Sequence, residues 1–502
     1  MKLNTRDIFK FDYLMLLLVL GLSFYITFIP HQSYPYAIHV DEWKHMAYSQ
    51  SMMQSGDITF NDPFFGEKTI SFRNNLEAGF HLFWGVFQTI SGIDWMIIFR
   101  YFPSIMFMIT VLAVYILASR EGFGWEAAFF TALIPTTVGI LGPSFLVPVA
   151  TGLIFTPLFL FLAFNFRTIW SYLAIFLFNC FLLAIHAPSA ISPIIVLTPY
   201  ILLNMRGNFK HSLGLLIALL APFLAALPLI SWLVIITARD IITTPVTPQE
   251  FVQLPHLIKT YGYLPTAACL LGTFILALKG GKKNYGLVLG LLLLLLMLVT
   301  FFTLNRGVPI MYERGLMYMI LMLGIAAGYG LMWLKNMSLP EQVNLRLKVP
   351  LIITRNSGKF LCLVFLGATL AISIPAHLHT PYYQMIDKED YQAFIWIKEN
   401  VGDNFEKAIV DPWKGTAFTA LTGKYVYTKI HEYPKADDDQ AYDFIRGGSS
   451  NTTLLRTNDI SIIYTRLYEG NQNQHIEYAI NNPDLEEVAK NIYLLKAVKL
   501  TK

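Results

Sequence analysis

A series of apolar runs, each long enough to cross a lipid bilayer, constrains the fold of this chain more than any other feature. A span needs about 20 apolar residues, since the hydrocarbon core is about 30 Å thick. Because unpaired backbone polar groups are costly in hydrocarbon, such runs are predicted to be helices. They lie at residues 11–30, 99–118, 125–142, 147–165, 168–186, 188–205, 211–236, 263–278, 285–304, 311–334 and 360–378.

The composition agrees with a polytopic membrane protein. The sequence is 55% hydrophobic and 14% charged, whereas an ordinary globular domain has about 25% charged residues. The first run follows a basic N-terminal segment and lacks a small-x-small cleavage site, so we predict a retained helix and not a cleaved signal peptide. All three cysteines lie within apolar runs, which argues against a disulfide framework or a thiolate metal site. We predict an α-helical membrane domain of about 11 spans over residues 1–379.

The basic residues between the runs predict the orientation of the chain, because cytoplasmic loops are enriched in Lys and Arg. A further apolar piece, residues 76–92, is either a short span or a helix at the membrane interface. If it does not cross, the basic loops share the side of the basic N-terminus. These loops contain Arg120, Arg167, Arg206, Lys210, residues 279–283, Lys335, Arg346, Lys348, Arg355 and Lys359. We therefore expect a cytoplasmic N-terminus, a first external loop at residues 31–98 and an extracytoplasmic C-terminus.

The tail, residues 380–502, differs in kind from the rest of the chain. Strand-like segments at 407–411, 424–430 and 460–466 alternate with helical segments at 387–402 and around 438–445, which predicts a small α/β domain. Counting Lys and Arg against Asp and Glu gives 14 against 18 in this tail, so the sequence shows no basic surface for nucleic acid. The tail also contains a glycosylation sequon, Asn451-Thr452-Thr453.

Two adjacent carboxylates, Asp41 and Glu42, begin a short amphipathic pattern just after the first apolar run. Three interpretations are open. Asp41 is a preferred helix cap, with Glu42 favourably placed near the positive end of the helix dipole. Alternatively, the pair is catalytic, since carboxylates at a membrane edge are often functional. As a third interpretation, the two acids bind Mg²⁺ or Mn²⁺.

The order of motifs in this region resembles that of the GT-C class of integral-membrane glycosyltransferases. This class includes protein O-mannosyltransferases, lipid A aminoarabinose transferase and the catalytic subunit of oligosaccharyltransferase. In the class, an acidic pair opens the first external loop, a Gly-Asp…Pro stretch follows, and Arg-x-x-Pro-Ser begins the next span. The matching residues here are Asp41, Glu42, Gly56, Asp57, Pro63, Arg100, Pro103 and Ser104. The resemblance is detailed over the first 120 residues and only architectural beyond them.

The resemblance implies a sugar donor linked to a polyprenyl or dolichyl phosphate. Asp41 would then be the general base that takes a proton from the acceptor, with Glu42 as a helper. Either acid, or both, would bind a divalent metal against the departing phosphate, if one is used. The departing phosphate also needs cations, for which the class places an arginine near the last external loop. We expect Arg314, Arg306, Tyr312 and His186 to bind the phosphate of the donor. We expect residues that close over substrate to include His256, Lys259, Arg73 and Lys68.

The sequence departs from the oligosaccharyltransferase branch in two places. Residues 142–152 read GPSFLVPVATG and contain no acid, whereas that branch has a second acidic motif in this loop. The tail also lacks the Trp-Trp-Asp motif that binds acceptor asparagine, although DPWKG occurs at residues 411–415. Transfer to a sequon asparagine is therefore disfavoured, and the branches that transfer a single sugar are the better match.

We therefore expect a membrane enzyme, a glycosyltransferase of the cell envelope, that works among membrane lipids on the extracytoplasmic side. Its acceptor would be a protein, a lipid or a glycan. Two alternatives remain open. A secondary transporter or lipid flippase would favour inverted repeats and ionisable groups at mid-span. A non-catalytic assembly or sensor subunit would keep the fold and tolerate loss of both Asp41 and Glu42.

Overall fold

The structure is a computed structural model of the chain. It describes residues 5–71, 75–136, 142–243, 245, 252–338, 356–430, 435–470 and 472–496. By its internal contacts the chain divides into two compact units. The membrane unit comprises Met1–Gln32 and Tyr101–Pro381, and the loop–tail unit comprises Ser33–Arg100 and Tyr382–Lys502. The predicted first external loop, a name kept below for residues 31–98, thus lies almost entirely in the same compact unit as the tail.

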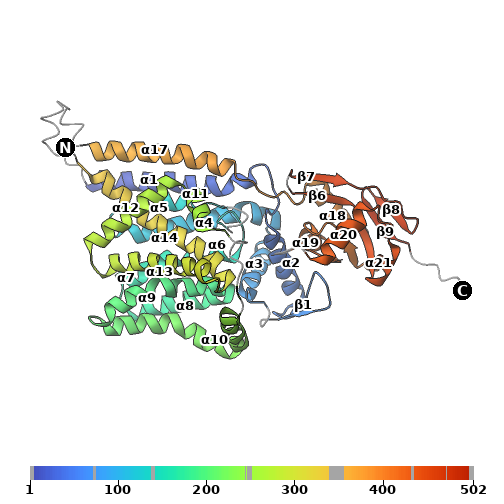
Figure 1. Ribbon diagram of the computed structural model, residues 1–502, viewed down its shortest axis with the longest axis horizontal. Coiled ribbons are helices and arrows are strands. Elements are labelled where there is room, and N and C mark those ends of the chain that lie inside the picture. Colours follow the sequence, from blue (N-terminus) through green and yellow to red (C-terminus); the bar gives the residue numbers. More distant parts are fainter. Residues whose placement is uncertain are drawn as a thin grey trace. The chain divides into compact units, whose positions relative to one another are not determined.

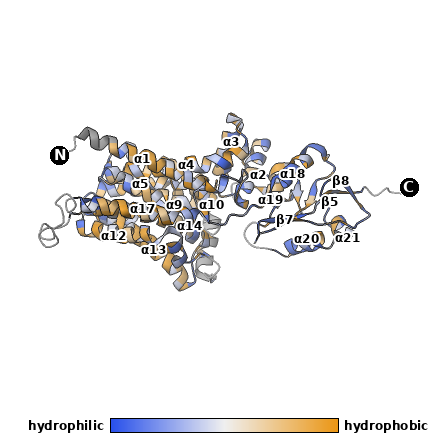
Figure 2. Cartoon of the chain, turned by 90° about the horizontal axis from the view of Figure 1, so that it is seen from above, coloured by the Kyte–Doolittle hydropathy of each residue, from blue (hydrophilic) through white to orange (hydrophobic). Residues whose placement is uncertain are grey.

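The membrane unit is made of helices, whose long members run nearly parallel or antiparallel to one another (Figure 1). Their ribbons are largely orange in Figure 2, the colour of hydrophobic residues, and many large apolar side chains of these helices are exposed. The helices are α1 (Thr5–Phe28), η1 (Ile29–His31), α4 (Trp95–Ser119), α5 (Gly124–Ala132), α6 (Pro148–Gly152), α7 (Phe155–Asn165), α8 (Ile169–Ile185), α9 (Ala187–Met205), α10 (Phe209–Thr243), α11 (Leu254–Tyr261), α12 (Tyr263–Lys279), α13 (Lys282–Leu304), α14 (Pro309–Asn336) and α17 (Ser357–Leu378).

Eight stretches among the described residues are long and apolar enough to cross a membrane, or nine if α11 and α12, bent by 103°, form one broken span. The expected count of eleven is therefore not confirmed. The predicted span 125–142 begins as α5 but ends at Ala132, just before Pro135, and residues 137–141 lie outside the described residues. All nine residues of α5 are buried, so its uniformly apolar sequence reflects burial in protein and not a full membrane crossing. Another predicted span, residues 168–186, forms α8, whose 17 residues are slightly too few for it to count among the candidate spans.

Helix α14 forms the packing centre of the membrane unit, and glycines allow its neighbours to approach closely. A Cβ atom at Gly272 of α12 would lie 1.8 Å from the carbonyl oxygen of Ala326 in α14. A Cβ atom at Gly328 of α14 would lie 2.3 Å from Cα of Ala127 in α5. Small residues at such contacts are typical of membrane helix pairs. Helices in lipid gain no hydrophobic free energy by associating, so their association depends on close van der Waals packing of their backbones.

This packing predicts unequal effects for two glycine substitutions. Gly272→Val places a branched side chain against backbone atoms of α14, and overpacking of this kind costs about 1–3 kcal/mol. Gly367→Val, in the similarly apolar helix α17, meets nothing within 4 Å and is the matched control. Melting of the purified proteins in detergent should show a lower Tm for Gly272→Val alone. Equal Tm values for both variants would contradict the proposed contact.

The tail forms an α/β domain, as expected from its sequence. Its five-stranded sheet has the order β4-β3-β5-β9-β8, with β3 parallel to β4 and β5, and β9 antiparallel to β5 and β8. A separate hairpin pairs β6 with β7. The elements are α18 (Lys388–Asn400), β3 (Lys407–Ile409), α19 (Gly415–Thr422), β4 (Tyr425–Val426), α20 (Ala436–Arg446), α21 (Thr452–Thr457), β5 (Ile460–Tyr464), β6 (Arg466–Glu469), β7 (Gln474–Glu477), β8 (Leu485–Ala489) and β9 (Ile492–Leu495). Asn451 of the sequon caps α21 by accepting the Leu454 N–H at 3.1 Å.

The first external loop contributes two helices and a two-stranded ribbon to the loop–tail unit. These are α2 (Val40–Ser55), β1 (Phe60–Asn61), β2 (Thr69–Ile70) and α3 (Ala78–Ser91). Helix α2 packs against α3 and against α19 of the tail. Tyr34 donates a hydrogen bond to the Ile386 carbonyl at 2.8 Å, and the Val426 N–H donates to the Phe64 carbonyl at 2.9 Å. Loop and tail are therefore one packed body, although they are far apart in sequence.

Helix α3 covers the ambiguous segment 76–92. Its 14 residues span about 21 Å, and it is not among the candidate membrane spans. Phe80, His81 and Trp84 are buried on one side, whereas Leu82, Phe83, Val86 and Ile90 are exposed on the other. This amphipathic helix agrees with the alternative in which residues 76–92 do not cross.

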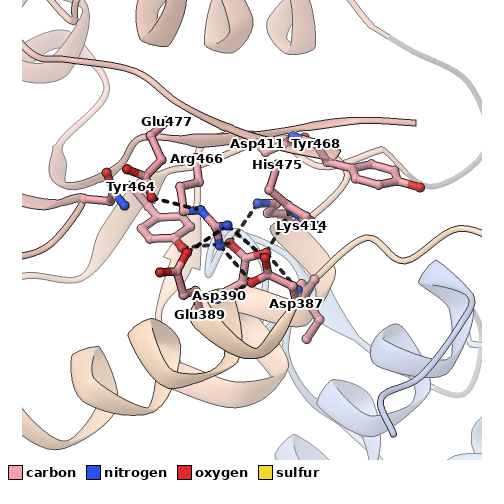
Figure 3. A network of polar contacts seen from close by, with 12 residues as sticks. Asp387, Glu389, Asp390, Asp411, Lys414, Tyr464, Arg466, Tyr468, His475 and Glu477 are labelled. Atoms are coloured by element: carbon pink, nitrogen blue, oxygen red, sulfur yellow. Dashed lines mark hydrogen bonds and ion pairs between the residues drawn. The ribbon is translucent and has the colours of Figure 1, made fainter. Parts of the chain in front are cut away.

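A buried ionic network anchors α18 to the strands of the tail (Figure 3). The Lys414 ammonium and the Asp390 carboxylate are fully buried and lie 2.8 Å apart, and the Arg466 guanidinium lies 3.0 Å from the same Asp390 oxygen. Tyr464 donates a hydrogen bond to this oxygen at 2.7 Å. Burial opposes ionisation of Asp390, but Lys414 and His475 hold the pKa of its carboxyl below the usual value.

Candidate active site

The capping of α2 is different from the simplest expectation. His39, in extended conformation, is the N-cap, and its Nδ1 accepts the Asp41 N–H at 3.2 Å. Glu42 completes a capping box, because its Oε2 accepts the N–H groups of Ile38 and His39 at 2.9 and 3.0 Å. The interpretation of Asp41 as the helix cap is therefore wrong. The fully buried Glu42 carboxylate holds the start of the helix, and the Asp41 carboxylate is not required for capping.

The Asp41 side chain is partly accessible. It is 17% exposed, and its Oδ2 lies 3.6 Å from His39 Nδ1. A general base must be fixed by its surroundings and still reach the proton that it abstracts. Asp41 meets both conditions, since α2 is anchored at its first turn and the carboxylate retains access to the surface.

A lysine of the tail, Lys429, lies near the first external loop. Its Nζ sits over the ring of Phe64, 4.3 Å from the ring centroid. Burial and the charge of Lys44 together lower the pKa of Lys429 to about 8, while Asp62 and Asp41 oppose this shift. Lys429 is thus within electrostatic reach of the proposed base and of a second cation, Lys44.

The loop that carries Phe64 is fixed by its own backbone. Asp62 Oδ1 accepts the Phe64 N–H at 2.9 Å, and the Asp62 carbonyl accepts the Gly66 N–H at 2.8 Å. Gly66 has a φ of +76° and lies so close to Tyr425 that a Cβ atom would come within 2.8 Å of the ring. Only glycine fits this position without strain. The exposed Lys68 follows in the turn before β2, where its carbonyl accepts the Asp62 N–H.

Three residues near Asp41 were not predicted from the sequence to belong to the candidate site: Lys429, Lys44 and Asp62. Lys429 ends a strand-like segment, KYVYTKI, with no motif that distinguishes it from a solvated lysine. Its partners lie in the first external loop, so only the packing of loop against tail reveals the cluster. Lys44 follows Asp41 by three residues, about one turn of α2, and this spacing was the available signal.

The membrane unit contains the expected cations. Arg314, near the start of α14, is largely buried, and its guanidinium lies 3.7 Å from the Glu313 carboxylate. It also interacts electrostatically with His186, which lies at the junction of α8 and α9. His186 pairs with Ser189 Oγ at 2.7 Å. The Tyr312 ring stacks on Phe301, and its hydroxyl donates a hydrogen bond to the Val252 carbonyl. Both contacts are structural.

The remaining expected residues are more dispersed. Arg306 is exposed in the turn between α13 and α14, and His256 and Lys259 are exposed on α11. Arg73 lies outside the described residues. The structure therefore groups Arg314 with His186 in the membrane unit, and groups Asp41 with Lys44 and Lys429 in the loop–tail unit.

Two groups of side chains among the described residues have an arrangement that could hold a metal ion, His45–Glu77–His81 and Asp387–Asp390–His475. The second belongs to the buried network, where Lys414 and Arg466 already neutralise the acids. The expected pair of Asp41 and Glu42 is not one of these groups. Because Glu42 accepts two backbone N–H groups, its carboxylate is committed to the helix start.

The fold has counterparts among solved structures. The apo oligosaccharyltransferase of Archaeoglobus fulgidus superposes with a TM-score of 0.62 and 10% identity, over 90% of this chain and 69% of the other. The arabinofuranosyltransferase AftD from Mycobacteria superposes with a TM-score of 0.55 and 16% identity, over 96% of this chain but only 40% of that longer protein. No protein-family model matches the sequence, and no curated protein matches it. At these identities the likeness concerns the fold alone, and the chain shares its fold with an oligosaccharyltransferase and an arabinofuranosyltransferase.

Proposed function

We propose that this protein is a membrane glycosyltransferase that takes a sugar from a polyprenyl- or dolichyl-phosphate donor on the extracytoplasmic side. The fold shared with two membrane glycosyltransferases supports the general activity. The observation that carries the proposal is the accessible Asp41 carboxylate at an anchored helix start, with Lys429 and Lys44 within electrostatic reach. An acid beside two cations suits a reaction that removes a proton and releases a phosphate.

The reaction requires that one bond form and one break at the anomeric carbon. The acceptor hydroxyl attacks this carbon, its proton passes to Asp41, and the bond between the sugar and the lipid phosphate breaks. The phosphate leaves with the electron pair and gains negative charge, which cations stabilise. We assign this role to Lys429 and Lys44. The phosphate-binding role expected for Arg314 and His186 in the membrane unit stays a separate prediction. Glu42 and His39 act as positioning residues for α2.

The acceptor is proposed to be a hydroxyl group of a protein, lipid or glycan. A second structure of the Archaeoglobus fulgidus oligosaccharyltransferase holds a tethered acceptor peptide with an NVT sequon. It superposes on this chain with a TM-score of 0.59 and 10% identity, over 90% of this chain and 68% of the other. This chain has no acid at residues 142–152, where that branch has its second acidic motif. We therefore place it with enzymes that transfer a single sugar. If Mg²⁺ or Mn²⁺ takes part, Asp41 is the member of the expected acidic pair that would hold it, because the Glu42 carboxylate is committed to the helix start. The ion would supply positive charge against the phosphate.

Removal of the Lys429 charge should slow transfer and change its pH dependence. A charged hydrogen bond to phosphate contributes about 1.5–3 kcal/mol, so Lys429→Met should lower kcat/KM by about 10- to 100-fold. Because the pKa of Lys429 is about 8, the ammonium is present at neutral pH and is lost as the pH rises through 8. Wild-type activity should fall over this range, and Lys429→Arg should remove the fall.

The measurement is the rate at which free prenyl phosphate is released from a labelled prenyl-phosphate sugar, followed from neutral pH to about pH 9. Lys424→Met is the control, since the contacts of Lys424 are with Gly402 and Asp403. If Lys429→Met and Lys424→Met behave alike, Lys429 is not a phosphate-binding residue.

A further inference from the structure

Helices α2 and α3 bring two histidines and a glutamate together in the loop–tail unit. His45 follows Asp41 by one helical turn, and its Nδ1 lies 2.8 Å from Nε2 of His81 on α3. The Glu77 carboxylate, just before α3, lies 4.0 Å from His45 Nδ1. One ligand atom from each residue lies within 4.8 Å of the others. We propose that His45, Glu77 and His81 form a binding site for a divalent transition-metal ion, for which Zn²⁺ is the best match.

The donor set supports this choice of ion. Two imidazole nitrogens and one carboxylate oxygen suit Zn²⁺, whereas Mg²⁺ and Ca²⁺ prefer oxygen ligands alone. Ligand atoms in a tetrahedral zinc site lie about 3.3 Å apart, so His45 and His81 need to separate by only about 0.5 Å to admit the ion. The Glu77 side chain is 23% exposed, which gives the ion a path from solvent and leaves room for a water as fourth ligand.

Both imidazole rings are buried between α2 and α3, since His45 is 3% exposed and His81 is fully buried. An ion held by these two rings would therefore be shielded from bulk water except on the side of Glu77.

Asn75 provides the contact that orients His81. Its Nδ2 lies 3.1 Å from His81 Nδ1, while its Oδ1 accepts the Glu77 N–H at 3.3 Å. In this arrangement His81 carries its proton on Nε2 and donates it to His45. For Nε2 to bind a metal, the proton must move to Nδ1 and Asn75 must turn its amide oxygen toward it. Metal-bound histidines commonly donate their second N–H in this way.

The experiment measures metal binding and is independent of transferase activity. Full-length protein, purified in detergent and stripped with a chelator, is titrated with Zn²⁺ by calorimetry and with Co²⁺ by visible absorption. We expect one equivalent per chain, and a Co²⁺ spectrum of tetrahedral type. Glu77→Gln removes a ligand near the surface and should weaken binding strongly, whereas Glu67→Gln, in the exposed turn before β2, should leave it unchanged.

Two variants of Asn75 separate a metal site from a purely structural histidine pair. Asn75→Asp offers a carboxylate to His81 Nδ1–H and should retain or tighten binding. Asn75→Leu removes the acceptor and should weaken binding by about 10- to 100-fold. Gel filtration checks that each variant remains folded. The proposal is overturned if wild-type protein binds no Zn²⁺, or if Glu77→Gln and Asn75→Leu both bind it as wild type does.

Discussion

Asp41→Asn is expected to abolish sugar transfer while leaving the protein folded in the membrane. An amide has the size of the carboxylate but cannot accept the acceptor proton, and loss of a general base typically lowers kcat by about 10²- to 10⁴-fold. The fold should persist because the start of α2 is held by His39 and by the Glu42 carboxylate. The measurement is release of labelled prenyl phosphate by purified protein, together with a gel-filtration profile.

Asp57→Asn is the matched control for this prediction. Asp57 is an exposed acid of the same external loop, and its carboxylate accepts only a local hydrogen bond from the Thr59 N–H at 3.0 Å among the contacts described. Its substitution should leave the rate of transfer within about twofold of wild type, since surface changes of this kind have small effects. Full activity of Asp41→Asn would show that another group takes the proton.

Lys414→Met is expected to destabilise the loop–tail unit strongly. It leaves the Asp390 carboxylate fully buried with one fewer cation, and breaking a buried ion pair costs about 3–5 kcal/mol. Arg466 and His475 still contact Asp390, so we expect the lower end of this range. Limited proteolysis of the purified protein should show faster cleavage of the tail.

Two further variants test the cause of this effect. Lys490→Met removes an exposed lysine that pairs with Glu389 and Glu477, and it should not change the cleavage rate. Asp390→Asn combined with Lys414→Met removes both charges and should be less destabilising than the sum of the single changes. Strict additivity would mean that the two side chains are not coupled.

The network also predicts a pH dependence. Burial raises the pKa of Asp390 and its cationic neighbours lower it by more, so the folded pKa lies below that of an unfolded chain. The stabilisation is therefore present at neutral pH and is lost as the pH falls below about 4. Burial lowers the pKa of Lys414 despite its two aspartate neighbours, yet contact at 2.8 Å with Asp390 keeps this pair ionised at neutral pH.

Patterns within short segments of the sequence predicted the helices, strands and caps, because these depend mainly on interactions between residues that are close in sequence. The length of the apolar runs predicted most of the membrane helices, and short strand-like segments between helical ones predicted β3, β4 and β5 in the tail. The same criterion failed for α5, because a short helix buried on all sides has the composition of a span. Capping was also within reach of the sequence, since Glu42 stands three residues after His39, the spacing of a capping box.

The union of the first external loop with the tail could not be predicted in this way. It depends on contacts such as Tyr34 with the Ile386 carbonyl, made by residues that carry no motif. The position of Lys429 over Phe64 and near Asp41 follows from the same packing. The sequence therefore identified the acid of the candidate site, while the neighbouring cation of the tail emerged only from the fold.

The most direct test of the central claim is mass spectrometry of the lipids that co-purify with the protein. The protein is extracted from its host membrane in mild detergent, and bound lipids are compared with those of Asp41→Asn, which should retain donor because it cannot complete transfer. We expect a prenyl phosphate carrying a sugar, enriched over bulk lipid and more abundant in the variant. Recovery of bulk phospholipids alone from both proteins would contradict the proposed use of a lipid-phosphate donor.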